Sequence, residues 1–210
     1  MVRTRPLEVA ASGEHTGVLR LAIVAWKEEG RTTLLRPLAH LLASSVVEVT
    51  RDASSPIVLV PVPTTRRSRL SRGADVVDQL AHGAAGLLSD AGIDVSVRQS
   101  LRVARRTADQ AGLGARARAK NLAGAFHLRS AEGLAGRRHI VVVDDIVTTG
   151  ATLGEAVRAL TASGHQPRAA AVVAHRPRRR RRSATDPRRP MESETLPGYG
   201  HRYGMSTFRT

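Results

Sequence analysis

The segment from residue 140 to residue 152, IVVVDDIVTTGAT, constrains the fold more than any other part of the chain. Its four leading apolar residues predict a buried strand, and the amphipathic run Leu153 to Leu160 predicts a following helix. Between them lie two carboxylates and a loop of small polar residues. A strand, a loop and a helix in this order form part of a βαβ unit, so the segment predicts an α/β protein with a mostly parallel sheet.

The polar residues of this segment predict a ligand site. Asp144 and Asp145 follow the strand, and the carboxyl ends of the strands are where an open α/β sheet binds its ligands. We expect this pair to contact hydroxyl groups or a metal. The loop that follows consists of Thr148, Thr149, Gly150, Ala151 and Thr152. Backbone N–H groups at a helix N-terminus bind anions, and glycine allows close approach. A pair that binds a ribose, beside a loop that binds its 5′-phosphate, indicates a phosphoribosyl group.

Hydrophobic periodicity organises the remaining chain around this unit. Residues 1–16 look loose, and we expect two helices, within 17–30 and 32–49, before any strand. The expected strands are residues 57–62, 93–97, 140–143 and 169–173, with a further helix over 74–88. Their alternation with helices predicts parallel pairing with right-handed crossovers and one domain over residues 17–175.

Residues 176–210 differ in composition from the rest. Ten of them are Arg and three are acidic, so this segment carries a charge of +7, about half of the formal net charge of +15. A block of like charges with proline cannot bury enough apolar surface to order itself, so we expect a disordered basic tail. Tyr199, Tyr203 and Phe208 offer an alternative role, in which they stack on nucleic-acid bases.

The composition excludes several classes of protein. The chain has no cysteine, which rules out a disulfide framework and a cysteine-ligated zinc site. No apolar run is long enough to span a membrane and the first residues show no signal-peptide pattern, so we expect a cytoplasmic protein. Of 33 basic residues only Lys27 and Lys120 are lysine. Arginine suits phosphate or nucleic-acid binding, although a GC-rich coding sequence produces the same bias.

Two further groups of cations are candidates for binding pyrophosphate. Arg66, Arg67 and Arg69 follow the expected strand that ends in Pro61-Val62-Pro63. Arg105 and Arg106 lie in a long basic connection, residues 98–121, which has the composition of a flexible loop over the site. In both places a solvated basic turn is the alternative.

The segment 140–152 resembles the 5-phosphoribosyl-1-pyrophosphate (PRPP) motif of type I phosphoribosyltransferases: four apolar residues, two acidic residues, then Thr-Gly-x-Thr. Receiver domains also place an acidic pair after a strand, but they carry it near the N-terminus and lack the Thr-Gly-x-Thr loop. The stretches VPVPTTRRSRLSRG and RRTADQAGLGARARAKNLAGAF, in this order before the motif, resemble the ComF family associated with DNA uptake. The helix with Trp26-Lys27 and Gly30 also resembles a Lys-x-x-Gly helix of that family.

The resemblance implies a type I phosphoribosyltransferase-like fold with a flexible loop over the site. It also implies a Mg²⁺ cofactor that reaches Asp144 and Asp145 through water, without a direct metal ligand from the protein. Asp144 and Asp145 are the expected catalytic residues. Two departures matter: the four-cysteine zinc module of many relatives is absent, and Ala74-Asp75-Val76 replaces their Phe-Asn-Gln. Thr148 also replaces the aspartate of hypoxanthine-guanine enzymes.

Three functions remain compatible with the sequence. The first is a Mg²⁺-dependent phosphoribosyltransferase of nucleotide metabolism that releases pyrophosphate, the second a non-catalytic PRPP or nucleotide sensor, and the third a competence factor that handles DNA. The expected partners are PRPP, an unidentified base or other acceptor, single-stranded DNA and a second copy of the chain in a homodimer. No membrane partner is expected.

Overall fold

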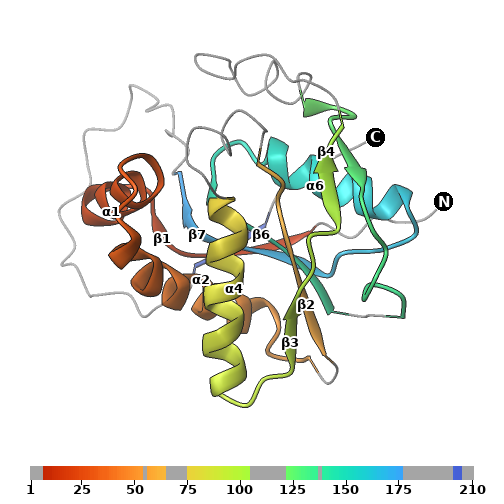
Figure 1. Ribbon diagram of the computed structural model, residues 1–210, viewed down its shortest axis with the longest axis horizontal. Coiled ribbons are helices and arrows are strands. Elements are labelled where there is room, and N and C mark those ends of the chain that lie inside the picture. Colours follow the sequence, from red (N-terminus) through yellow and green to blue (C-terminus); the bar gives the residue numbers. More distant parts are fainter. Residues whose placement is uncertain are drawn as a thin grey trace, which may run out of the picture.

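The computed structural model describes residues 7–53, 56–64, 75–104, 122–136 and 139–176, and the backbone of residues 201–204. In these residues a central sheet is covered by helices (Figure 1). Its six strands have the order β3-β2-β6-β7-β1-β8. They are β1 (Glu8–Glu14), β2 (Ile57–Pro61), β3 (Val95–Val97), β6 (His139–Val147), β7 (Ala169–His175) and β8 (His201–Gly204).

The pairing of the sheet is parallel except at one edge. β2 pairs in parallel with β3 and β6, and β7 pairs in parallel with β6 and β1. β8 pairs antiparallel with β1 and forms the edge strand. The five parallel strands confirm the predicted α/β class and its mostly parallel sheet.

One prediction about the chain ends is wrong, and a second is wrong at four residues. Residues 8–14, expected to be loose, form the buried strand β1, so a strand precedes the first helix. β1 reads EVAASGE and has a single β-branched residue, Val9, so its strand character in the sequence is weak. Its place is instead decided by pairing with β7. Within the tail expected to be disordered, residues 201–204 form β8. The remainder of the tail lies outside the described residues, except Arg176.

Four α-helices cover the sheet in the described residues. Three of them start within two residues of a position where the sequence predicts a helix start: α1 at Gly17, α4 at Val76 and α6 at Ala151. The Asp75 carboxylate accepts a hydrogen bond from the backbone N–H of Asp78, which caps the first turn of α4. The helices are α1 (Gly17–Glu28), α2 (Leu35–Val49), α4 (Val76–Asp90) and α6 (Ala151–Ala162), and a 3-10 turn at Thr32–Leu34 precedes α2.

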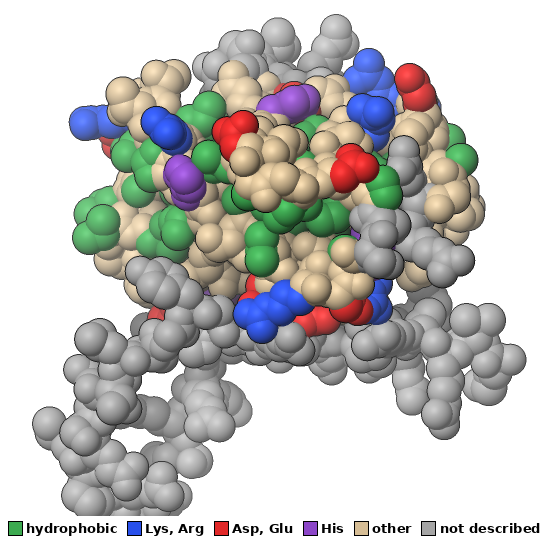
Figure 2. All heavy atoms as spheres, turned by 90° about the horizontal axis from the view of Figure 1, so that it is seen from below, with side chains coloured by type: hydrophobic (Ala, Val, Ile, Leu, Met, Phe, Trp, Pro, Cys, Tyr) green, Lys and Arg blue, Asp and Glu red, His purple; other side chains and the backbone are tan. Residues whose placement is uncertain are grey.

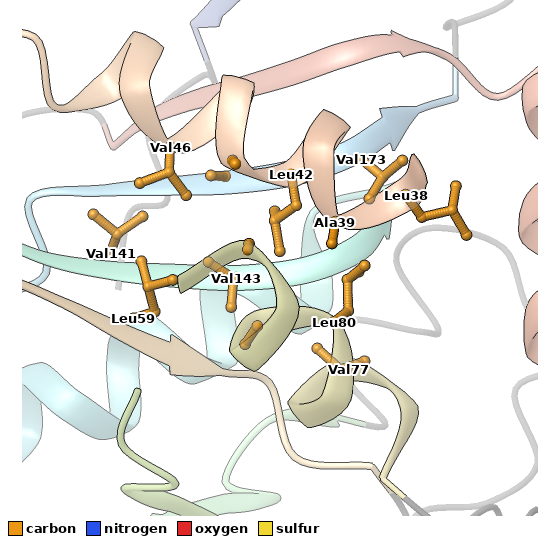
Figure 3. Packing of buried hydrophobic residues seen from close by; sticks show 14 of the residues in the cluster. Leu38, Ala39, Leu42, Val46, Leu59, Val77, Leu80, Val141, Val143 and Val173 are labelled. Atoms are coloured by element: carbon orange, nitrogen blue, oxygen red, sulfur yellow. The ribbon is translucent and has the colours of Figure 1, made fainter. Parts of the chain in front are cut away.

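Each face of the sheet buries its own hydrophobic cluster. α1, α2 and α4 cover one face, where Leu42 and Leu80 pack against Val141 and Val143 of β6 (Figure 3). On the other face, Leu153 of α6 packs in the cluster that contains Ile140 and Val142. This alternation along β6 follows from the period of two in a strand. Burying each large side chain contributes about 1.5–3 kcal/mol, so both faces hold β6 in place.

A small second sheet lies beside the face covered by α6. It consists of β4 (Leu101–Val103) and β5 (Phe126–Leu128), which pair antiparallel. The sequence analysis predicted neither strand, because each is only three residues long and is too short to show an alternating pattern. β4 falls within the flexible connection expected over residues 98–121, so this part of the prediction is wrong. Residues 105–121 of that connection are outside the described part of the chain.

Candidate phosphoribosyl site

The acidic pair lies where β6 extends past its neighbour. β2 ends at Pro61, which pairs with Val143, whereas β6 continues beside β7 as far as Val147. Asp144 and Asp145 therefore lie immediately beyond the end of β2. The prediction that the strand ends at residue 143 is wrong by four residues, because β7 continues the pairing along one side only.

The chain leaves β2 and β6 toward opposite faces of the sheet. After β2 it enters α4 and returns to β3, while after β6 it enters α6 and returns to β7. α4 packs in one hydrophobic cluster and α6 in the other. Adjacent parallel strands with diverging connections leave a crevice at their carboxyl ends, which is the usual ligand position in such sheets. The acidic pair borders this crevice.

Both carboxylates are buried and bonded to nearby groups. Asp144 Oδ1 accepts a hydrogen bond from Asp145 N at 2.8 Å, and Asp145 Oδ1 accepts one from Ile146 N at 3.0 Å. Asp145 Oδ2 forms an ion pair with Lys27 Nζ from α1. Asp144 is 8% exposed and Asp145 is 3% exposed, so both residues are largely removed from water.

Lys27 is a site residue that the sequence analysis did not select. It lies 118 residues before Asp145, and no local spacing connects the two. The available signal was its rarity, since it is one of two lysines among 33 basic residues. Its resemblance to the Lys-x-x-Gly helix of the ComF family pointed to the same position.

Burial changes the acid strength of the pair. Burial, and next the negative charge of Asp145, raise the pKa of Asp144 well above its usual value, while the Lys27 charge opposes the shift. Two adjacent carboxylates resist simultaneous ionisation when few cations compensate them. A perturbed acid in a crevice is typical of a functional site, and here the geometry supports the same interpretation.

The loop after the pair has the backbone geometry predicted for an anion site. Gly150 has φ +78° and immediately precedes α6, so this position is in the left-handed region that favours glycine. No side chain caps the helix at this residue, and its first turn has no acidic residue. Ala151 N donates a long hydrogen bond, 3.4 Å, to Thr149 Oγ1. The loop that follows the acidic pair therefore runs directly into the N-terminus of α6.

A hollow of about 420 Å³ lies at the end of β2. Its lining includes Pro61–Pro63, the carboxylates of Asp75 and Asp78, and the guanidinium groups of Arg102 and Arg129. Within the described residues, Thr64 Oγ1 is buried and has no hydrogen-bond partner. The predicted residues Arg66, Arg67, Arg69, Arg105 and Arg106 lie outside the described part of the chain.

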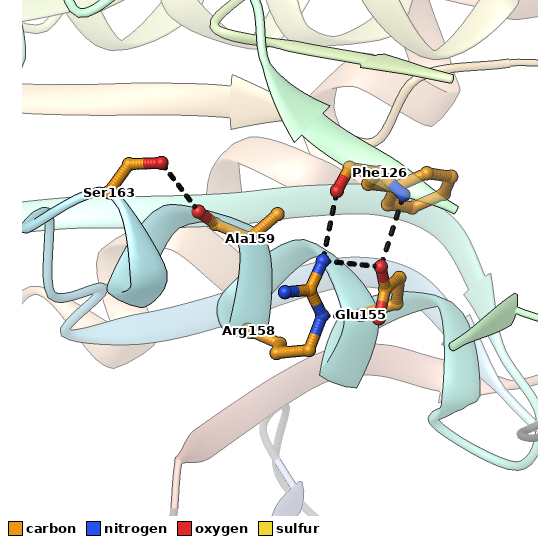
Figure 4. A network of polar contacts seen from close by, with 5 residues as sticks. All are labelled: Phe126, Glu155, Arg158, Ala159 and Ser163. Atoms are coloured by element: carbon orange, nitrogen blue, oxygen red, sulfur yellow. Dashed lines mark hydrogen bonds and ion pairs between the residues drawn. The ribbon is translucent and has the colours of Figure 1, made fainter. Parts of the chain in front are cut away.

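A second polar network, centred on Glu155 of α6, fastens the helix to β5 (Figure 4). Glu155 Oε1 accepts hydrogen bonds from Phe126 N at 3.0 Å and from Arg158 at 2.8 Å. Arg158 also donates to Phe126 O at 3.0 Å. Burial alone would raise the pKa of Glu155, but the bonds from Arg158 and Phe126 N lower it. The sequence analysis missed this network, because Glu155 and Arg158 look like surface residues of one helix and their partner Phe126 lies 29 residues before Glu155.

The described residues contain no group of three or more histidines or carboxylates suited to hold a metal. Asp144 and Asp145 nevertheless provide hard oxygen donors, which match the ligand preference of Mg²⁺. Because Mg²⁺ keeps several waters and often binds through one or two carboxylates plus substrate phosphates, this pair fits a metal that arrives with a phosphorylated ligand.

A family model described as the phosphoribosyl transferase domain matches residues 35–194, which include the acidic pair and its loop. The chain belongs to this family. It is 34% identical over 154 residues to the DNA utilization protein YhgH of Salmonella typhi, covering 72% of this chain and 64% of that one. It is 29% identical to Competence protein F of Haemophilus influenzae, covering 72% and 66%. The predicted resemblance to the ComF family is confirmed. The chain spans slightly less than two thirds of the length of these relatives.

Solved structures with a similar chain path include hypoxanthine phosphoribosyltransferases. One from Trypanosoma cruzi, in a ternary substrates complex, is 19% identical, covers 72% of both chains and has a TM-score of 0.38. Another from the same organism is 17% identical, covers 72% of this chain and 69% of that one, and has a TM-score of 0.41. Among the described helices of the present chain, none is long and apolar enough to cross a membrane.

Proposed function

We propose that this protein binds PRPP and transfers its phosphoribosyl group to an acceptor, with release of pyrophosphate. The observation that carries the proposal is the juxtaposition, at one crevice, of the buried pair Asp144-Asp145 and the glycine-led start of α6. Asp144 and Asp145 bind the ribose hydroxyls. The loop Thr148, Thr149, Gly150, Ala151 and Thr152 binds the 5′-phosphate through backbone N–H groups and hydroxyls.

The hollow at the end of β2 is suited to pyrophosphate. Arg102 and Arg129 line it, and the buried hydroxyl of Thr64 lies at the same strand end. Guanidinium groups bind phosphate oxygens with two parallel hydrogen bonds. Arg66, Arg67, Arg69, Arg105 and Arg106 belong to the two segments that continue from this strand end and from β4, and we propose them as further pyrophosphate ligands.

The transfer requires orientation more than acid-base chemistry. Displacement at the anomeric carbon develops positive charge on the ribose ring, and negative charge accumulates on the departing pyrophosphate. The acidic pair orients the ribose beside the growing positive charge, while the guanidinium groups stabilise the negative charge. Asp144 and Asp145 would hold Mg²⁺ through water, and the ion would supply neutralisation of the phosphate charge.

Calorimetry with PRPP, with and without Mg²⁺, tests the binding step, and pyrophosphate release with a panel of bases tests the transfer. Gly150→Val is the informative variant, since a β-carbon at φ +78° is strained and obstructs the approach of the phosphate. We expect it to lose PRPP binding while unfolding cooperatively. Gly86→Val is a control for added bulk, because space at Gly86 on α4 is open. Parental affinity in Gly150→Val would refute the phosphate loop.

A DNA-handling function is the second candidate, favoured by relatives named as DNA utilization and competence proteins. On the face shown in Figure 2, described acidic and basic side chains are interspersed among hydrophobic ones, without a continuous basic patch. Binding of single-stranded DNA that weakens steeply with salt would support this function, since such binding depends on phosphate contacts.

A further inference from the structure

Lys27 occupies an unusual position at the acidic pair. Its ammonium is bonded to Asp145 Oδ2, while the other oxygen of Asp145 accepts the Ile146 N–H. Both oxygens of this carboxylate therefore already have partners. A ribose hydroxyl or a metal-bound water that approaches Asp145 must share or replace the contact with Lys27.

The packing of α1 fixes the backbone of Lys27 but leaves the position of its ammonium group variable. Ile23 and Trp26 are 1% and 4% exposed and anchor the helix to the core, and Lys27 follows Trp26 in the last turn. The side chain of Lys27 remains 26% exposed. A lysine carries a compact charge on a flexible stem of four carbons, so its ammonium can change partners while the helix stays in place.

The surrounding composition supports a special role for this lysine. Arginine provides nearly all the positive charge of the chain, and Lys120 is the only other lysine. A guanidinium at this position would bind the carboxylate through two parallel bonds and would be harder to displace. The site therefore has the cation that yields more readily to an incoming ligand.

We propose, resting on the function above, that Lys27 is a resident cation of the site. Without ligand it neutralises Asp145. When Mg²⁺ and PRPP bind, its ammonium leaves Asp145 Oδ2 and binds a phosphate oxygen of PRPP. Lys27 thus competes with divalent metal for the carboxylate but assists the binding of PRPP. Its removal should therefore raise the affinity for the metal and lower the affinity for PRPP.

Titration with Mn²⁺ alone, and separately with PRPP in saturating Mg²⁺, tests this proposal on Lys27→Met. We expect Mn²⁺ to bind about tenfold more tightly than to the parent, and PRPP to bind about tenfold more weakly, the range expected when one charge-assisted bond is lost. Lys27→Arg should not gain Mn²⁺ affinity. Arg20→Met removes one charge from the same helix at an exposed position and should change neither affinity.

Unchanged or weaker Mn²⁺ binding in Lys27→Met would overturn the proposal, as would unchanged PRPP binding. Thermal unfolding of each variant identifies loss of fold, and Lys27→Gln replaces Lys27→Met if the latter is unfolded. A parent protein that binds Mn²⁺ but not PRPP would instead refute the proposed function. The Mn²⁺ comparison would still decide whether Lys27 competes with metal.

Discussion

Asp144 and Glu155 are both buried carboxylates on consecutive elements, yet their surroundings act on them in opposite directions. Glu155 accepts hydrogen bonds from Phe126 N and from the Arg158 guanidinium, which lower its pKa despite burial. Burial and the neighbouring charge of Asp145 raise the pKa of Asp144. The same chemical group is well compensated on α6 and poorly compensated at the end of β6.

We propose that this difference separates a structural carboxylate from a functional one. The bonds of Glu155 join α6 to β5, so its negative charge is matched within the fold (Figure 4). The two carboxyl groups of the acidic pair share one cation, Lys27, and accept hydrogen bonds from two local backbone N–H groups. A fold retains such uncompensated charge when a ligand supplies the missing partners. Three predictions test the contrast, from the largest expected effect to the smallest.

The double variant Asp144→Asn with Asp145→Asn should weaken PRPP binding by roughly 100-fold or more. Each lost charge-assisted hydrogen bond costs about 1.5–3 kcal/mol, and about 1.4 kcal/mol corresponds to a tenfold change. Calorimetry measures the affinity, and thermal unfolding should show that the variant still folds. Retained affinity would remove the ribose assignment.

Glu155→Ala should have the reverse profile, with a loss of about 2 kcal/mol in unfolding free energy and little change in PRPP affinity. The substitution leaves the Phe126 N–H buried without its acceptor and leaves Arg158 unpaired. Denaturant unfolding measures the loss. Glu155→Gln, which keeps an acceptor for Phe126 N, should recover part of it. A loss of PRPP binding with unchanged stability would contradict the structural role.

The pH dependence of stability should differ in sign between the two groups. Because the folded-state pKa of Asp144 is raised above its ordinary value of 3.8, parental stability declines as pH rises from that value through the folded pKa. Asp144→Asn lacks this decline, so its advantage over the parent should grow with pH. The pKa of Glu155 is lowered from 4.5, so its contribution is present above that value and is lost as pH falls through the folded pKa.

Denaturant unfolding at a series of pH values compares Asp144→Asn and Glu155→Gln with the parent. The disadvantage of Glu155→Gln should shrink in acid, while the advantage of Asp144→Asn should shrink there as well and be greatest at neutral pH. Parallel curves for parent and Asp144→Asn across the whole range would show that Asp144 does not titrate abnormally.

Local sequence patterns predicted the unit that forms the centre of the site. The apolar run at residues 140–143, the acidic pair and Gly150 act over one strand, one turn and the start of one helix. Periodicity and turn chemistry are short-range properties, so these features could be predicted without knowledge of the fold. The same reasoning placed α1, α4 and β2 within a few residues of their observed bounds.

The tertiary structure decided what neighbouring elements contribute to that unit. β1 has small side chains and weak strand character, and it becomes a strand because β7 pairs with it. The contact of Lys27 with Asp145 and the bonds between Glu155 and Phe126 join residues that are far apart in the chain. By itself the sequence determined the strand, the acidic pair and the glycine-containing loop, because these depend on adjacent residues. Only folding determined which carboxylate is compensated, because burial and charge depend on elements brought together across the sheet.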